Sequence, residues 1–264
     1  TPPANSVKGL EKGSEVSPDE ICIPFKLMAD NLMEAYRMGA DTAVMPATMG
    51  PCRLGEYGEL LKSILDKRGY PFRWILLDST LAVGKKEMLR RLAYLVSDSG
   101  KRKSEIMRAL YGTYKILKNL ELLDQRAHIL AAYEMQKGDC KKEVSACRRD
   151  LAEAESIEAA LYILRRHLYF LENVQVDFGR KPPHILLTGE IFSMIEPFAN
   201  HHIEELLMDM GVSFEKRVTL GWWIRNTILN PFQLRTLLTR KNRYLPYAIG
   251  GYAKETVEDG VLCS

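Results

Sequence analysis

The part of the sequence that most constrains the fold is the stretch between residues 22 and 77, where helical periodicity alternates with short apolar runs. Pro24 suits the first turn of a helix, because its missing N–H would have no partner there. Thr42–Met45 and Arg73–Asp78 are typical of buried parallel strands. A second helix is expected between these strands, from about Gly55 to Lys67. This order predicts a βαβ progression with a parallel sheet.

The rest of the chain divides into a helical region and a second α/β region. Residues 85–179 carry helical stripes and almost no strand signal, so three or more long helices are expected there. In the region 180–264, His184–Thr188 and Val212–Leu220 are expected strands and His201–Met210 an expected helix. The predicted fold class is therefore α/β, with two Rossmann-like parallel-sheet units (1–84 and 180–264) joined by the helical segment 85–179.

Composition excludes several classes of protein. The chain has 264 residues, a net charge of +3 and five unevenly spaced cysteines. This charge is too small to predict binding to nucleic acid or to an acidic membrane surface. No apolar run approaches the roughly 20 residues that span a bilayer. The cysteines form no disulfide framework, which favours a reducing cytoplasm.

Two cysteines stand just ahead of expected helix N-termini. Cys22 precedes the helix that contains Pro24, and Cys52 precedes the helix that begins near Gly55. Both positions belong to the carboxyl edge of the expected sheet, where open α/β sheets bind ligands. A helix N-terminus favours a thiolate over a thiol, and two thiolates suit a metal cluster. The alternative interpretation is a pair of buried structural thiols.

Basic residues accompany the two cysteines. Lys26 and Arg53 are placed to offset the negative charge of a thiolate-bound cluster or to hold a phosphate of coenzyme A. The alternatives are plain solvation for Lys26 and a salt bridge to Glu56 for Arg53.

Two later segments are further candidates for ligand binding. Gly189 and Glu190 follow the expected strand of the second α/β unit and lie at its ligand edge; the alternative is a tight turn with a helix-capping acid. Gly250 and Gly251 precede an expected helix, whose backbone N–H groups suit an anion.

Two other groups of metal-type residues have simpler explanations. Cys140 and Cys147 would share one face of a helix and are interpreted as incidental thiols. His201 and His202, followed by two glutamates, do not form a His-Glu-x-x-His motif, and acidic residues are ordinary at helix N-termini.

The sequence segments around the cysteines resemble those of a known family. The segments are Cys-Ile-Pro-Phe-Lys at 22–26, Gly-Ala-Asp-Thr-Ala-Val-Met-Pro at 39–46 and Gly-Pro-Cys-Arg-Leu-Gly-Glu-Tyr-Gly-Glu at 50–59. They resemble the iron–sulfur component of the 2-hydroxyacyl-CoA dehydratase and benzoyl-CoA reductase superfamily, and most closely its activase-related relatives. The segments around Gly189 and Gly250 extend the resemblance.

This resemblance implies a [4Fe-4S] or larger iron–sulfur cluster held mainly by three cysteines per subunit. Cys22 and Cys52 match the first two. The third cysteine ligand is not present in this chain, because no Pro-x-x-Cys-Met-Pro-Glu-type segment follows Gly251, and Cys263 lacks that context. The chain is accordingly expected to be a fragment that lacks both ends of the full protein.

The resemblance also implies a function. The expected role is an iron–sulfur electron-transfer or reductive component of an anaerobic system, which is reduced by an ATP-hydrolysing activase protein and acts on an acyl-CoA substrate within a homo- or hetero-oligomer. One alternative is a non-enzymatic partner or regulatory module of such an activase and dehydratase system. A second is a cofactor-free α/β protein that binds a small molecule.

Overall fold

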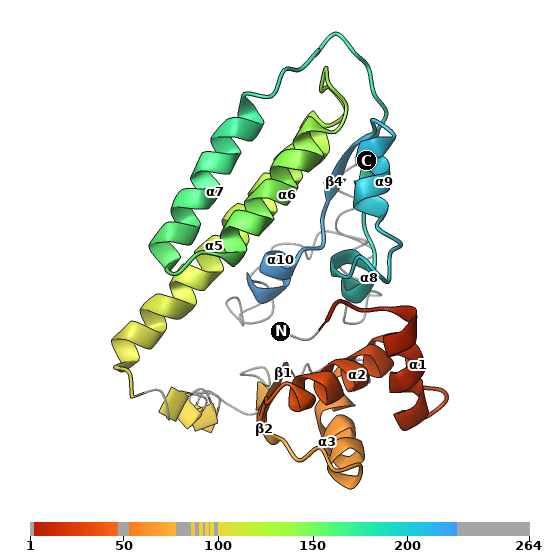
Figure 1. Cartoon of the computed structure of the whole chain (residues 1–264), viewed down its shortest axis with the longest axis vertical. Helices are drawn as coiled ribbons and strands as arrows, with labels where there is room; N and C mark the ends of the chain where they lie inside the picture. Colours follow the sequence, from red (N-terminus) through yellow and green to blue (C-terminus); the bar gives the residue numbers. More distant parts are fainter. Residues whose placement is uncertain are drawn as a thin grey trace, which may run out of the picture. The chain divides into compact units, whose positions relative to one another are not determined.

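The computed structural model describes residues 3–46, 53–77, 86–87, 90–91, 93–94, 96–97 and 100–225. These residues form a helix-rich mixed α/β protein with two small parallel sheets of two strands each. They divide at residue 100 into two compact units, which are described separately (Figure 1). No helix among the described residues is long and apolar enough to cross a membrane.

The first unit contains the sequence order expected for residues 22–77. Helices α1 (Val7–Val16) and α2 (Ile23–Arg37) precede strand β1 (Thr42–Pro46). A 3-10 turn, η1 (Arg53–Glu56), and helix α3 (Tyr57–Lys67) then lead to strand β2 (Arg73–Leu77). The two strands are parallel, with Thr42 opposite Arg73, as the βαβ order predicts.

Apolar side chains of α2, α3 and β1 form the core of this unit. Phe25, Ala29, Met45, Tyr57 and Leu61 are buried together. Helix α1 packs closely on α2 because Gly13 has no side chain, and a Cβ atom there would overlap the backbone carbonyl of Lys26.

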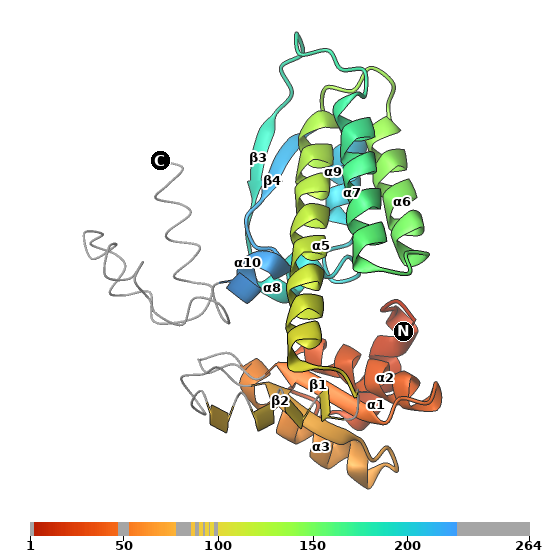
Figure 2. The same ribbon diagram turned by 90° about the vertical axis from the view of Figure 1, so that its left-hand side faces the viewer.

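The second unit begins with three helices, α5 (Lys103–Leu130), α6 (Asp139–Ala152) and α7 (Ile157–Glu172). Strand β3 (His184–Leu187), the short helix α8 (Ile191–Ile195), helix α9 (Ile203–Asp209), strand β4 (Ser213–Lys216) and helix α10 (Leu220–Ile224) follow. Strands β3 and β4 are parallel, with His184 opposite Ser213. Figure 2 shows this sheet beside α5 and the two other long helices.

The helices of the second unit share one core with its sheet. Leu123 of α5, Cys147 of α6 and Leu164 of α7 belong to the same buried cluster as Phe214 of β4. The sequence places the helices in a separate connector and begins a new unit at residue 180, whereas the structure divides the chain near residue 100. The physical reason is that α5 presents an apolar face to the sheet as well as to its neighbouring helices, so the sheet is covered by the helices that precede it.

Candidate functional site

Cys22 is the N-cap residue of α2, as the position of Pro24 predicts. Its backbone is extended, with φ −65° and ψ 152°, and its carbonyl oxygen accepts a hydrogen bond from the N–H of Phe25 at 3.1 Å. Its side chain makes no capping hydrogen bond, and the residue is exposed. The thiol is thus held at a helix N-terminus while remaining open to a ligand.

The hydroxyl group of Tyr57 contacts this thiol. The distance from Cys22 Sγ to Tyr57 Oη is 2.6 Å. Tyr57 is the first residue of α3 and only 3% exposed, and its ring meets that of Phe25 edge to face with centroids 5.1 Å apart. Packing fixes the position of the Tyr57 ring. The Tyr57 hydroxyl group, at the start of α3, is therefore held beside the Cys22 thiol at the start of α2.

The two basic residues of the predicted site support the turn that precedes Cys22. Lys26 Nζ donates to the carbonyl oxygen of Asp19 at 3.2 Å, and Arg53 donates to that of Glu20 at 3.3 Å. Among the described residues, Arg53 forms no salt bridge with Glu56, which was the alternative interpretation for this side chain. Both side chains thus donate to backbone carbonyl oxygens two or three residues before Cys22 and support the turn at that point.

Three other residues of the predicted site lie outside the described residues. These are Cys52, Gly250 and Gly251, and Cys263 lies outside them as well.

Gly189 and Glu190 belong to the second unit, immediately after β3. Glu190 is the N-cap residue of α8, and its Oε2 accepts hydrogen bonds from the N–H groups of Phe192 at 2.9 Å and Ser193 at 3.2 Å. Glu190 therefore caps the N-terminus of α8, which is the alternative interpretation of Gly189 and Glu190 given above.

The other described cysteines do not suit metal binding. Cys140 and Cys147 share the inner face of α6, and both are fully buried. Burial raises the pKa of the Cys147 thiol to about 11, and it raises that of Cys140 further, together with the hydrogen bond to Glu134. Both therefore remain protonated structural thiols, which leaves Cys22 as the described thiol that fits a cluster ligand.

No group of three or more His, Cys, Asp or Glu side chains that could hold a metal ion occurs among the described residues. The histidine and glutamate residues near 201–205 make pairwise polar contacts instead. His202, with a left-handed backbone (φ 55°), lies 3.4 Å from Glu205. Glu204 lies 3.2 Å from His128 Nε2 and 2.6 Å from Lys216 Nζ.

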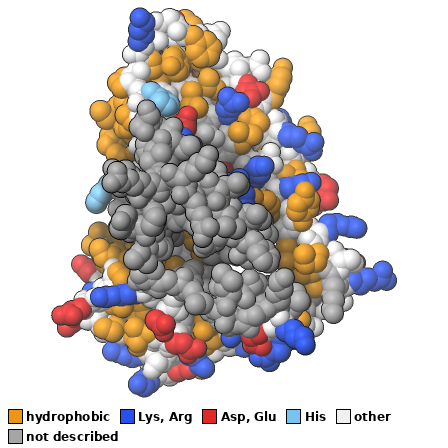
Figure 3. Space-filling model, turned by 180° about the vertical axis from the view of Figure 1, so that it is seen from behind, with side chains coloured by type: hydrophobic (Ala, Val, Ile, Leu, Met, Phe, Trp, Pro, Cys, Tyr) orange, Lys and Arg blue, Asp and Glu red, His pale blue; other side chains and the backbone are white. Residues whose placement is uncertain are grey.

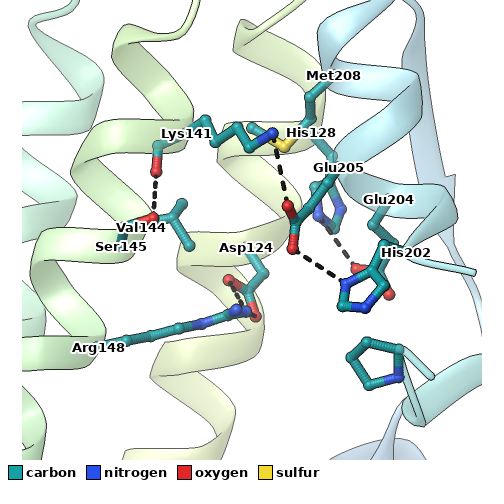
Figure 4. A pocket seen from close by; sticks show the side chains of 11 residues that line it. Asp124, His128, Lys141, Val144, Ser145, Arg148, His202, Glu204, Glu205 and Met208 are labelled. Atoms are coloured by element: carbon teal, nitrogen blue, oxygen red, sulfur yellow. Dashed lines mark hydrogen bonds and ion pairs between the residues drawn. The ribbon is translucent and has the colours of Figure 1, made fainter. Parts of the chain in front are cut away.

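Near these residues, α5, α6 and α9 line an open pocket of about 110 Å³ with several charged side chains in its wall (Figure 4). Helix α5 contributes Asp124 and His128, one turn apart. Helix α6 contributes Lys141 and Arg148, two turns apart, and helix α9 contributes glutamates at its start.

The pocket shifts the pKa values of two carboxyl groups in opposite directions. Burial raises the pKa of Asp124 above its ordinary value, and the charge of Arg148 opposes that shift. Burial also acts on Glu204, but hydrogen bonds and charge from His128 and Lys216 outweigh it and hold the pKa at about 2. Opposite pKa shifts of carboxyl groups in one pocket are common at functional sites.

Sequence reasoning did not find this pocket as a site. Spacings that place Asp124 with His128, and Lys141 with Ser145 and Arg148, on single helix faces are visible in the sequence. Such spacings are ordinary for solvent-exposed helix faces, and only the packing of α5, α6 and α9 makes these faces meet.

The described surface shows no single basic patch on the face seen in Figure 3, where Lys and Arg side chains are scattered among acidic and hydrophobic ones.

Comparison with known proteins adds no relative: no family model, no curated protein and no solved structure matches the chain.

Proposed function

We propose that this protein is the iron–sulfur component of an electron-transfer or reductive system related to the 2-hydroxyacyl-CoA dehydratases. The observation that carries the proposal is Cys22, an exposed thiol at the N-cap of α2 with a fixed neighbour in Tyr57. The resemblance of the segments around residues 22–26 and 50–59 supplies the identity of the cluster.

Cys22 and Cys52 would hold the cluster, with further ligands from outside this pair. Such a cluster supplies one-electron transfer at low potential. The chain's own contribution is to hold the sulfur of Cys22 at a helix N-terminus and to fix the turn before it through Lys26 and Arg53.

The proposal extends to partners and to the fold. An ATP-hydrolysing activase would reduce the cluster, an acyl-CoA would be the substrate, and the active form would be a homo- or hetero-oligomer. The two α/β units would be Rossmann-like, each built around one of the parallel strand pairs.

Replacing the thiol tests this function. Cys22→Ser should abolish the broad visible absorption of a thiolate-bound cluster in protein purified without oxygen, because an alcohol does not replace a thiolate as ligand. Cys147→Ala is the matched control, since that thiol is buried in the other unit and should leave the absorption intact. Full absorption in Cys22→Ser would refute Cys22 as a ligand, whereas no such absorption in the unchanged protein would favour a non-enzymatic partner module.

A further inference from the structure

The pocket between α5, α6 and α9 is lined by charged groups that already have partners. Arg148 lies 3.1 and 3.2 Å from the two carboxylate oxygens of Asp124. Lys141 lies 3.5 Å from Glu205 and 2.9 Å from Asp209. The wall of the pocket therefore carries basic and acidic side chains that are paired with each other (Figure 4).

Some of these pairs are weaker than others. Glu204 is held firmly, because Lys216 lies at 2.6 Å. Glu205 is half exposed, and both of its contacts, with Lys141 and His202, are 3.4 Å or longer, at the limit of a hydrogen bond. Arg148 uses one nitrogen for Asp124, and its other N–H groups make no hydrogen bond within the part of the chain that the structure describes. Glu205 and Arg148 can therefore accept a new partner.

A buried polar atom also lacks a partner at this pocket. His128 lines it, is 6% exposed and stacks on Phe214 with ring centroids 4.2 Å apart. Its Nε2 faces Glu204, whereas its Nδ1 is buried without a hydrogen bond among the described residues. A buried polar atom of this kind costs free energy until it is paired.

Size and charge balance together restrict what can bind. A volume of about 110 Å³ is well below the roughly 300–1,000 Å³ of pockets that take drug-sized ligands, so a nucleotide or coenzyme A does not fit inside. A small anion would draw Arg148 or Lys141 away and leave a carboxylate unpaired, and a small cation would do the reverse. Asp124 is the least exposed of these charged side chains, at 21%, and leaving its charge without Arg148 would be unfavourable.

We propose that this pocket binds a small zwitterion of the amino-acid type. Its carboxylate pairs with Arg148 and Lys141, and its ammonium group pairs with Asp124 and Glu205. Every charge of the wall then keeps a partner of opposite sign. This binding site belongs to the second unit and does not depend on an iron–sulfur cluster.

Glycine, acetate and methylammonium test the proposal, because the last two each carry one half of the charge of glycine. Chemical shifts of the His128 imidazole and of the α6 amides are followed by NMR during titration. We expect glycine to saturate with a Kd of about 1–10 mM, and each single-charge probe to bind at least about tenfold more weakly. Acetate binding as tightly as glycine would overturn the proposal, as would the absence of saturable shifts with glycine.

Two variants locate the binding. Arg148→Gln should weaken glycine binding at least about tenfold, whereas Arg165→Gln, at an exposed arginine of α7 outside the pocket, should leave it unchanged. Asp124→Asn should have the same effect as Arg148→Gln, and a thermal unfolding curve checks that each variant is folded. Unchanged glycine binding in folded Arg148→Gln and Asp124→Asn would contradict the proposed contacts.

Discussion

The thiol sulfur of Cys22 lies 2.6 Å from the hydroxyl oxygen of Tyr57, although 35 positions separate the two residues. This contact joins the N-terminal ends of α2 and α3. It places the Tyr57 hydroxyl group beside the one described thiol that is open to solvent, and it ties the candidate site to the core of the first unit through the Tyr57 ring.

Substitutions at Tyr57 separate the hydroxyl contact from ring packing. Tyr57→Phe should lower the free energy of unfolding by about 1 kcal/mol, because it removes one polar contact and keeps the ring against Phe25. Tyr57→Ala should cost about 3–5 kcal/mol, as expected for truncation of a buried aromatic side chain. Urea denaturation measures both, and equal losses would show that the hydroxyl group dominates instead.

The cysteines should differ in reactivity. In metal-free protein at neutral pH, iodoacetamide should modify Cys22 before the two other described cysteines, because this thiol is exposed. Cys140 and Cys147 should react only after denaturation, since burial raises the pKa of both thiols. Mass spectrometry of the peptides gives the order of modification, with Cys22→Ser as the control. Modification of Cys147 as fast as that of Cys22 would contradict the assigned burial.

The stability of the second unit should depend on Glu204 in a defined pH range. Its folded-state pKa is about 2, below the ordinary value of 4.5. Its contribution to stability is therefore fully present above about pH 4.5 and is lost as the pH falls toward 2. Glu204→Gln should lower the free energy of unfolding by roughly 3 kcal/mol at pH 7.

The difference between Glu204→Gln and the unchanged protein should disappear as the pH approaches 2. Glu205→Gln is the matched control, because the neighbouring carboxylate is half exposed and its ion pairs are long. Denaturant titrations across this pH range provide the measurement. A pH-independent difference would mean that Glu204 acts through packing rather than charge.

Helix packing in the first unit should depend on Gly13. Gly13→Ala places a Cβ atom onto the backbone carbonyl of Lys26, which cannot move without shifting α1 from α2. We expect a loss of about 3 kcal/mol or more. Gly112→Ala is the comparison, because its Cβ would lie 2.7 Å from the Cδ1 and Cγ2 methyl groups of Ile157, a side chain rather than backbone, and should cost less. Thermal unfolding measures the loss of stability in each variant. Equal losses would contradict the close contact between α1 and α2.

Most elements with strong local signals could be predicted from the sequence. The helix after Cys22 and the strands near Thr42 and Arg73 occur within a residue or two of their expected bounds. Helix α3 begins at Tyr57 rather than near Gly55, because Arg53–Glu56 forms a 3-10 turn first. Strong periodicity and a proline at the start make such elements visible without tertiary information.

Other elements depend on contacts that the sequence does not display. The strand expected over Val212–Leu220 is only Ser213–Lys216, since it pairs with the four residues of β3. Helix α8 was not predicted, because a helix of five residues is too short to show periodicity, although the capping acid Glu190 marks its start.

The candidate site was predictable only in part. Cys22 at a helix N-terminus follows from Pro24, which is a local feature. The neighbour Tyr57, the support of the turn by Lys26 and Arg53, and the pocket around His128 each need helices that are distant in sequence to meet. Sequence spacing identifies helix faces but not which faces pack together.

The proposed function requires Cys22 to be a ligand of an iron–sulfur cluster. The most direct measurement is the amount of iron and acid-labile sulfide per chain in protein purified without oxygen, for the unchanged protein and for Cys22→Ser. We expect about four of each in protein from the full-length gene, as in a [4Fe-4S] cluster, and only background in the variant. Iron-free protein from the full-length gene, or a full complement of iron in Cys22→Ser, would contradict the assignment of Cys22 as a ligand.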